Sequence, residues 1–210
     1  MAAGPKQWFF DAWSRIYDLP PVQAAVYRPV QNAVVAALRR RRVKRLLDVG
    51  CGTGLLTARL RREIRSTSVF GIDFSAGMLA HARARDEALP LVRGDGGRLP
   101  FGDGVLDAIV ATESFHWFPD PDGALAEFRR VLRPKGRLLL ALVNPRFALT
   151  GRLAYEASRL VGQPFHWPTA TDLARRIARA GFRIERQERL VRFPGVVIFP
   201  PMLTVARRRP

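Results

Sequence analysis

The stretch that decides the fold is Leu46-Leu47-Asp48-Val49-Gly50-Cys51-Gly52-Thr53-Gly54. An apolar run typical of a buried strand leads into three glycines at alternate positions, and helical spacing follows. Glycine tolerates a positive φ and lets the backbone approach a ligand closely, and the first turn of a helix offers unpaired N–H groups. The sequence therefore predicts a strand, turn and helix that hold a ligand at the turn. An ordinary turn without a ligand is the alternative.

Two better-known glycine loops do not fit this turn. The dinucleotide fingerprint G-x-G-x-x-G would need its third glycine at position 55, which is Leu55. The phosphate loop G-x-x-x-x-G-K-[ST] occurs nowhere in the chain. A helix N-terminus already favours anions, so the carboxylate of Asp48 beside the turn favours a ligand that carries positive charge.

The composition predicts one globular domain. The chain has 210 residues, of which 48% are hydrophobic, enough for a sizeable core. Cys51 is the single cysteine, which excludes a disulfide framework and a multi-cysteine zinc site, and we expect no bound metal. We find no secretory signal and no run of about 18 apolar residues that would span a bilayer. These features favour a reducing compartment and a cytoplasmic location.

The formal net charge of +17 would suit a nucleic acid or an anionic membrane as a partner. Nearly all the basic residues are arginines, and the one dense cluster is Arg39-Arg40-Arg41-Arg42-Val43-Lys44-Arg45. The helix dipole stabilises cations at the C-terminus of a helix, so the first interpretation of this cluster is a solvated helix end. Contact with lipid or RNA is the second.

Strand-like and helical segments alternate between residues 43 and 143, at a spacing typical of a parallel sheet with helices on both faces. We expect strands at 45–49, 68–72, 89–93, 106–111 and 136–143, and helices at 55–64, 76–86 and 121–132. This segment forms the core of the predicted domain.

The flanking segments differ from the core. Residues 1–42 predict an N-terminal helical cap whose second helix is kinked near Tyr27 by Pro29. Residues 144–210 predict one helix and then two strands joined only by a loop, which indicates a closing antiparallel hairpin. The expected elements are helices over 5–18, 22–40 and 169–180, and strands over 182–191 and 202–208.

Three further motifs follow the glycine turn. They are Val69-Phe70-Gly71-Ile72-Asp73-Phe74-Ser75-Ala76-Gly77-Met78-Leu79, then Gly94-Asp95 with Leu99-Pro100-Phe101, and Val131-Leu132-Arg133-Pro134-Lys135-Gly136-Arg137-Leu138. Together with the turn they resemble class I S-adenosylmethionine-dependent methyltransferases, in the broad group that includes ubiquinone and menaquinone methyltransferases. The resemblance covers about residues 45–143. It departs from the usual pattern at Lys135, where glycine is usual, and at Gly96, where alanine is common.

The resemblance implies a three-layer α-β-α sandwich with a Rossmann-like sheet of seven strands, mostly parallel, whose last strand is antiparallel. It also implies S-adenosylmethionine as the cofactor, bound beyond the carboxyl ends of the strands. The cofactor contacts that it implies are Asp48, Gly50, Gly52, Gly54, Asp73, Phe74, Met78, Asp95, Gly96, Thr112 and Tyr17.

Four of these residues have a second interpretation. Asp73 would accept the ribose hydroxyls, or only cap the following helix, and Asp95 would accept the adenine amino group, or only stabilise a turn. Met78 would pack on adenine or belong to the core. Tyr17 would cover the methionine end of the cofactor or lie on a core face of the cap.

Aromatic residues suggest a dry acceptor site. The triplet Phe-His-Trp occurs at 115–117 and again at 165–167, which is either a coincidence of sequence or brings two segments together in space. Trp8, Phe10 and Trp13 of the cap would form a lid, or else belong to its core. His116 follows the fourth strand, so it is the candidate catalytic base. Its alternative is a structural histidine that packs between Phe115 and Trp117.

The predicted function is transfer of a methyl group from S-adenosylmethionine to a small or lipid-like acceptor, on oxygen, carbon or nitrogen. No Asn/Asp-Pro-Pro-Tyr sequence follows the fourth strand, which disfavours methylation of amino groups on nucleobases or glutamine. The basic cap would suit peripheral contact with an anionic membrane. The alternatives are an RNA methyltransferase that uses the 39–45 cluster, and a non-catalytic regulator that binds S-adenosylmethionine.

Overall fold

The computed structural model describes residues 27–39, 42–64, 67–143, 148–160, 165–190 and 201–210. The first predicted cap helix, Tyr17 and the three lid aromatics therefore lie outside the described residues. The strands are β1 (Arg45–Val49), β2 (Ser68–Asp73), β3 (Leu91–Arg93), β4 (Leu106–Thr112), β5 (Leu132–Val143), β6 (Phe182–Arg189) and β7 (Pro201–Arg208). The helices are α3 (Arg28–Arg39), α4 (Leu55–Glu63), α5 (Ala76–Arg85), the 3-10 helix η2 (Phe115–Trp117), α6 (Pro121–Val131), α7 (Ala148–Leu160) and α8 (Ala170–Arg179).

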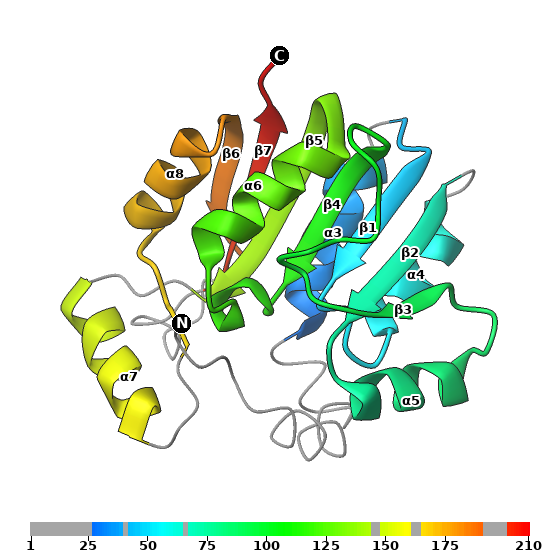
Figure 1. Ribbon diagram of the computed structural model, residues 1–210, viewed down its shortest axis with the longest axis horizontal. Helices are drawn as coiled ribbons and strands as arrows, with labels where there is room; N and C mark the ends of the chain where they lie inside the picture. The colour runs from blue at the N-terminus through cyan, green and yellow to red at the C-terminus, as the bar shows by residue number, and fades with distance from the viewer. Residues whose placement is uncertain (1–26, 40–41, 65–66, 144–147, 161–164, 191–200) are drawn as a thin grey trace.

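All seven strands form one sheet in the order β3-β2-β1-β4-β5-β7-β6. Neighbouring strands are parallel from β3 to β5, and β7 runs antiparallel to both β5 and β6. The predicted mostly parallel sheet with an antiparallel last strand is therefore confirmed. Because β1 to β5 run the same way, the loops after them meet at one edge of the sheet, which is the lower edge in Figure 1.

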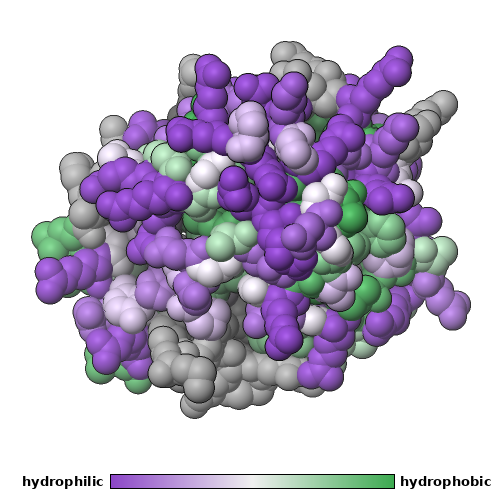
Figure 2. Space-filling view, turned by 45° about the horizontal axis from the view of Figure 1, so that its top comes forward, coloured by the Kyte–Doolittle hydropathy of each residue, from purple (hydrophilic) through white to green (hydrophobic). Residues whose placement is uncertain are grey.

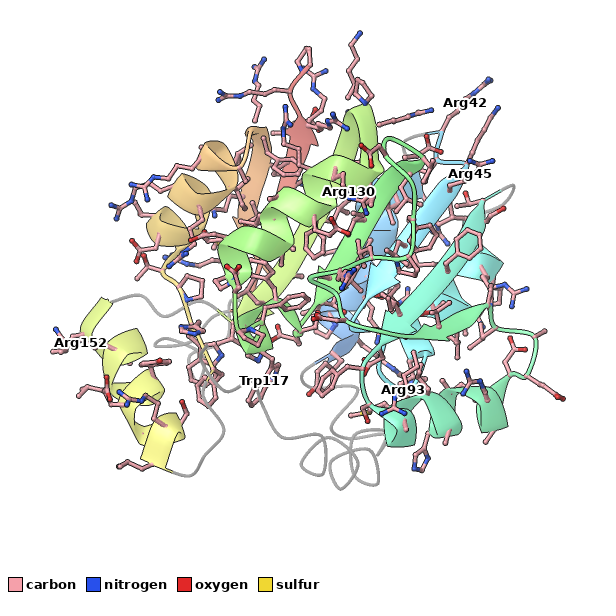
Figure 3. All side chains as sticks on the ribbon, viewed as in Figure 1. Arg42, Arg45, Arg93, Trp117, Arg130 and Arg152 are labelled. Atoms are coloured by element: carbon pink, nitrogen blue, oxygen red, sulfur yellow. The ribbon has the colours of Figure 1, made fainter. Side chains whose placement is uncertain are left out.

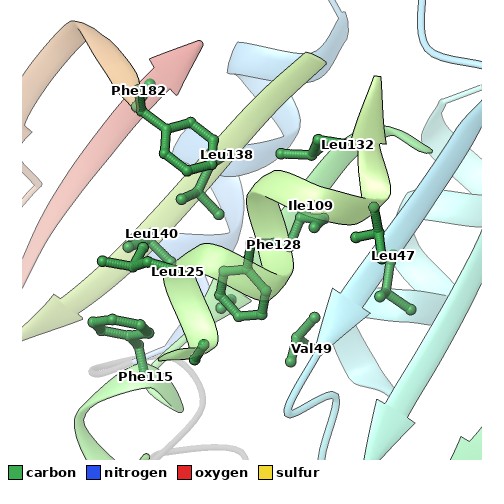
Figure 4. Close-up of a cluster of buried hydrophobic side chains, with 14 of the residues drawn as sticks. Leu47, Val49, Ile109, Phe115, Leu125, Phe128, Leu132, Leu138, Leu140 and Phe182 are labelled. Carbon is green, nitrogen blue, oxygen red and sulfur yellow. The ribbon is translucent and has the colours of Figure 1, made fainter. Parts of the chain in front are cut away.

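Helices cover both faces of the sheet, as the alternating pattern predicts. In Figure 1, α6 and α8 lie in front of the sheet, and α3 and α4 lie behind it. The front layer packs Phe128 of α6 against Leu138 and Phe182 (Figure 4). Ile177 of α8 belongs to the same cluster, and all four side chains are fully buried. The rear layer packs Val34 of α3 and Leu60 of α4 against the other face. The three-layer sandwich is thus confirmed.

Short-range signals start several helices where the sequence predicts them. The side chain of Ser75 accepts a hydrogen bond from the N–H of Met78 at 3.1 Å and caps α5. Thr169 accepts one from the N–H of Asp172 at 3.2 Å, and this bond caps α8. Each cap satisfies an N–H group that the helix itself leaves unpaired.

The structure differs from the sequence prediction at three elements. Helix α7 is not predicted, because its leucines do not mark a face buried against the sheet. Strand β5 starts at Leu132, four residues early, since Leu132 already pairs with Leu106 of β4 before an irregular stretch in the register. Strand β3 starts late, at Leu91, because the N–H of Leu89 bonds to the carbonyl of Asp86 in a turn. Helix α3 covers the described part of the predicted second cap helix, and Tyr27, just before Pro29, is in a π-helical turn at the position of the predicted kink.

Candidate active site

The glycine turn lies between β1 and α4, with its backbone held against β2. The N–H groups of Gly50 and Cys51 both donate to the carbonyl of Ile72, at 2.8 and 3.1 Å. Gly50 and Gly52 have φ values of 70° and 55°, which side chains other than glycine disfavour. A Cβ atom on Gly50 would lie 2.3 Å from Cβ of Ser114, whereas beside Gly52 the nearest atom is the sulfur of Met78 at 3.8 Å. Any side chain at position 50 would therefore clash with Ser114, whereas the space beside Gly52 is open and can hold a ligand.

Asp73 ties this turn to the next helix. Its Oδ2 accepts a hydrogen bond from the N–H of Gly52 at 2.8 Å, and its Oδ1 accepts one from the N–H of Ser75 at 2.9 Å. The residue is 7% exposed. A carboxylate has about four acceptor positions, so a side chain held in this way can also receive hydroxyl groups from a ligand at the rim.

Asp48 lies beneath the turn and not at the rim. It is 1% exposed, and its Oδ2 accepts a hydrogen bond from Oγ1 of Thr57 at 2.7 Å. Its Oδ1 is buried with no hydrogen-bond partner among the residues described. Burial raises the pKa of Asp48 to about 7, the hydrogen bond from Thr57 lowers it, and the nearby charge of Asp73 raises it further. A cation bound above the turn would stabilise the ionised form of this carboxyl.

The loop after β3 lies beside Asp73, because the N–H of Gly94 donates to the Asp73 carbonyl at 2.9 Å. Asp95 is exposed there, and its Oδ1 accepts a hydrogen bond from the N–H of Gly97 at 2.8 Å. A Cβ atom on Gly96 would lie 2.5 Å from Cζ of Phe118, so the aromatic ring explains why alanine is absent at this position.

The remaining predicted contacts lie around the same turn. Met78 is buried in the first turn of α5, next to Gly52, and Phe74 is half-buried just after β2. Gly54 begins α4, with its N–H bonded to the carbonyl of Cys51 at 3.0 Å. Thr112 ends β4 and lines a small pocket together with Gly50 and Tyr27. The predicted contact residues in the described ranges thus lie together at the carboxyl ends of β1 to β4, where this fold binds ligands.

Aromatic side chains form a second cluster directly after β4. The ring centroids of His116 and Trp117 lie 6.4 and 5.2 Å from that of Phe165, and Phe165 lies 4.5 Å from Trp167. The N–H of His166 donates to the carbonyl of His116 at 2.7 Å. The two Phe-His-Trp triplets therefore converge in space, which was one of the two interpretations of their repetition. We call His116, Trp117, Phe165 and Trp167 the aromatic cluster, and Figure 3 shows Trp117 near the lower edge of the molecule.

The aromatic cluster lies next to the glycine turn because Ser114 joins the two. Its Oγ donates to the carbonyl of Val49, the last residue of β1, at 2.9 Å. Two residues later the chain reaches His116, which is 6% exposed. The end of β4 thus brings the turn and the aromatic rings to adjacent parts of one edge.

His116 is neutral in this environment. Burial lowers the pKa of its imidazole to about 3, and its Nδ1 is buried without a hydrogen-bond partner in the described part of the chain. An imidazole with this pKa holds a transferred proton weakly near pH 7. The geometry therefore favours the packing interpretation of His116 over the catalytic base.

Glu113 is a residue to which the sequence analysis assigns no role. Its φ of 49° is unusual for a residue other than glycine, and such strain is concentrated at functional sites. Its Oε2 accepts a hydrogen bond from the N–H of Val143 at 3.3 Å, while its Oε1 is buried with no partner among described residues. Burial raises the pKa of Glu113 to about 8, and the bond from Val143 opposes that rise. No local sequence signal distinguishes this glutamate from an exposed one.

The described residues lack a metal-binding cluster and a membrane-spanning helix. They contain no group of three or more His, Cys, Asp or Glu side chains that could hold a metal ion. None of the described helices has both the length and the apolar character needed to cross a bilayer.

Known proteins resemble this chain in sequence and in structure. The family described as "Methyltransferase domain" matches residues 47–140. A demethylmenaquinone methyltransferase of Mycobacterium tuberculosis is 32% identical over 195 residues, covering 82% of each chain. A malonyl-[acyl-carrier protein] O-methyltransferase of Geobacter sulfurreducens is 33% identical over 172 residues, covering 76% of this chain and 64% of that protein. The structure of a magnesium protoporphyrin IX methyltransferase from Synechocystis, with bound SAH, superposes with a TM-score of 0.71 at 19% identity and covers 96% of this chain and 94% of the other.

The identity and the mutual coverage of the mycobacterial relative are high enough to establish common family membership. The strand order and the glycine turn agree with that relationship. The chain is a class I S-adenosylmethionine-dependent methyltransferase.

Proposed function

We propose that the acceptor is a lipid-like molecule with a flat, apolar ring, and that the aromatic cluster binds this ring beside the glycine turn. The observation that carries the proposal is the convergence of four aromatic rings, from segments about 50 residues apart, at the end of β4. Flat apolar rings pack well against such side chains. The mycobacterial relative is named for demethylmenaquinone, a ring of this kind.

The residues present fit S-adenosylmethionine, which supplies a methyl group on a positively charged sulfur. Beside Gly52 there is room for a ligand, and the carboxylate of Asp73 is oriented at the rim of that space. We assign the ribose hydroxyls to Asp73 and the adenine to Asp95 and the backbone of Gly96. The unpartnered Oδ1 of Asp48 gives the cationic end of the cofactor a buried negative charge nearby.

The aromatic cluster, His116 and Glu113 have separate roles in the proposed reaction. The aromatic cluster excludes water and holds the acceptor atom in line with the methyl group, and such positioning supplies much of the acceleration in a transfer of this kind. His116 forms part of the wall as a neutral ring. We assign to Glu113, whose pKa burial raises to about 8, a protonated carboxyl group that donates a hydrogen bond to an oxygen of the acceptor.

The 39–45 cluster lies away from this site, which weighs against the RNA methyltransferase. Arg45 begins β1, and the glycine turn follows the other end of that strand, so the cluster and the turn lie at opposite edges of the sheet (Figure 3). A cavity of about 470 Å³ at the cluster's edge is lined by Arg42, Arg133 and Lys135. A nucleic acid bound there would lie far from the reacting methyl group.

Calorimetry and a turnover screen test the proposal together. We expect the purified protein to bind S-adenosylmethionine and to methylate a short-chain demethylated quinone faster than a malonyl thioester or an RNA. Trp117→Ala should reduce quinone turnover while cofactor binding stays unchanged. Faster methylation of RNA, lost when Arg42 and Arg45 are replaced by alanine, would overturn the proposal. Cofactor binding with no turnover of any acceptor class would favour the non-catalytic regulator.

A further inference from the structure

Helix α7 exposes its leucine side chains and does not bury them against the sheet. Leu149, Leu153 and Leu160 are 67%, 62% and 89% exposed, whereas Gly151 and Ser158 are buried. At 3.6 residues per turn the three leucines fall within an arc of about 40°. The helix therefore packs its small residues against the protein and presents three leucines to the outside. The exposed Glu156 lies between Leu153 and Leu160 in the same row, and its carboxylate is paired with Arg159.

No other described element shows such a row. Among large hydrophobic residues in the described ranges, only Val92, at 40%, joins these three leucines as exposed. Helices α6 and α8 bury their apolar residues in the core instead. Hydrophilic residues cover most of the face shown in Figure 2. A row of three exposed leucines on one helix thus indicates a surface that another body covers.

Cations lie beside the leucine row. Arg152 and Arg159 are exposed on one flank, about 60–80° around the helix from Leu149. Arg152 points away from the sheet in Figure 3, and Arg159 pairs with Glu156 at 3.2 Å and lies over the ring of Tyr155. An apolar row flanked by arginines is typical of helices that lie in the surface of an anionic bilayer.

The opposite side of α7 is joined to the aromatic cluster. The rings of Tyr155 and His166 stack at 4.7 Å between centroids. The N–H of Phe165, a member of the cluster, donates to Oγ of Ser158 at 3.3 Å. A membrane or protein that covers the three leucines would therefore lie one helix diameter from the proposed acceptor site.

We propose that α7 is an interfacial helix, with its leucines inserted at the headgroup boundary of an anionic lipid bilayer and its flanking arginines on lipid phosphates. Resting on the proposed function, this placement lets a lipid-like acceptor pass from the bilayer to the aromatic cluster without crossing water. The bilayer contact thus belongs to α7 and not to the 39–45 cluster, which lies at the other edge of the sheet.

A second copy of the chain fits the leucine row less well than a bilayer does. A stable two-fold interface buries about 800 Å² on each partner, more than three leucine side chains in a single row provide. Such an interface would also place the arginines of one helix near those of its symmetry mate. The chain's net charge of +17 is better matched by an anionic lipid surface.

Vesicle co-sedimentation tests the proposal without any acceptor. The probes are vesicles of phosphatidylcholine alone and of phosphatidylcholine with 30% phosphatidylglycerol. We expect binding to the anionic vesicles, reduced at least about tenfold by the triple change Leu149→Ser, Leu153→Ser and Leu160→Ser, because each leucine contributes buried apolar area. Arg152→Glu with Arg159→Glu should weaken the anionic binding as well.

The matched controls are Val92→Ser, an exposed apolar residue on β3, and Arg42→Ala with Arg45→Ala at the opposite edge. Neither should change vesicle binding. All the variants should bind S-adenosylmethionine like the wild type, which separates this test from failure of the proposed function. The proposal is overturned if the wild type does not bind anionic vesicles, if the leucine variant binds as well as the wild type, or if that variant instead converts a dimer to a monomer.

Discussion

The two halves of the active edge are built in different ways. At the ends of β1 to β3, backbone N–H groups and carboxylates face a space beside Gly52, and the contacts come from short loops. At the ends of β4 and β5 lie the aromatic rings, the buried imidazole of His116 and the half-buried carboxyl group of Glu113, and the second triplet comes from a segment about 50 residues along the chain. We infer that the polar half holds the cofactor and the apolar half selects the acceptor.

The largest expected effect comes from Gly52→Ala in the polar half. The added methyl group would enter the open space beside the turn, and we expect S-adenosylmethionine binding to weaken at least about 100-fold, which corresponds to about 2.7 kcal/mol. The positive φ should cost only about 1–2 kcal/mol of folding free energy. Calorimetry and urea unfolding measure the two effects separately. Gly102→Ala is the matched control, since its Cβ would meet only Val105 at 3.7 Å, and unchanged binding in Gly52→Ala would contradict a ligand at this turn.

A smaller loss is expected from Asp73→Asn. The amide keeps the shape of the side chain but places an NH₂ group where one carboxylate oxygen accepts a hydrogen bond from Gly52 or Ser75. Loss of one charge-assisted hydrogen bond, about 1.5–3 kcal/mol, should weaken cofactor binding about 10- to 100-fold. Asp95→Asn should have a weaker effect, because Asp95 is exposed. Equal losses in both variants would mean that the ribose assignment is wrong.

Glu113→Gln sharpens the account of the apolar half through its pH dependence. The pKa of Glu113 is raised from its ordinary value near 4.5 to about 8, so between these values the folded protein holds a proton that the unfolded chain releases. The free energy of unfolding therefore falls as pH rises through this window. Glutamine cannot ionise, so the variant should match the wild type near pH 4 and be more stable at pH 8.5 by on the order of 1–3 kcal/mol.

Urea unfolding at the two pH values measures this difference. The raised pKa of Asp48, about 7, also makes the free energy of unfolding fall as pH rises. The pKa of His116, lowered from 6.5 to about 3, makes the free energy of unfolding rise with pH between those two values. Both remain in the variant, so the comparison isolates Glu113. The same difference between the two proteins at both pH values would show that Glu113 is exposed and ionised in solution.

The smallest expected effect lies outside both halves, at Lys135. Its φ of 66° suits glycine, which the methyltransferases that this chain resembles usually carry at this position. Lys135→Gly should stabilise the fold by about 0.5–1 kcal/mol, since the left-handed strain exceeds the added flexibility of the unfolded chain. Thermal unfolding measures the change, and cofactor binding should be unaffected. A lower melting temperature would contradict the strain.

The polar half could be predicted from the sequence because its signals lie close together. The glycine turn, the Ser75 cap and Asp73 are each defined by a few neighbouring residues, and the structure places the strands β1 and β2 within one residue of their predicted bounds. The burial of Asp48 beneath the turn was missed, because a residue in a strand next to a ligand loop can face either the rim or the helix layer.

The apolar half could be predicted only in part. The repeated Phe-His-Trp triplet allows two distant segments to meet, without requiring it, and the structure brings them together. Helix α7 and Glu113 were not predicted, because neither has a local signal. Burial of one carboxyl group and exposure of three leucines depend on tertiary packing, which a single sequence does not display.

A crystal structure of the protein with bound S-adenosylhomocysteine tests the division of the edge most directly. The account predicts the ribose hydroxyls within hydrogen-bond distance of the Asp73 carboxylate, the backbone of Gly52 against the ligand, and the sulfur facing the aromatic cluster. A nucleoside bound elsewhere, or one whose sulfur points away from Trp117, would contradict it.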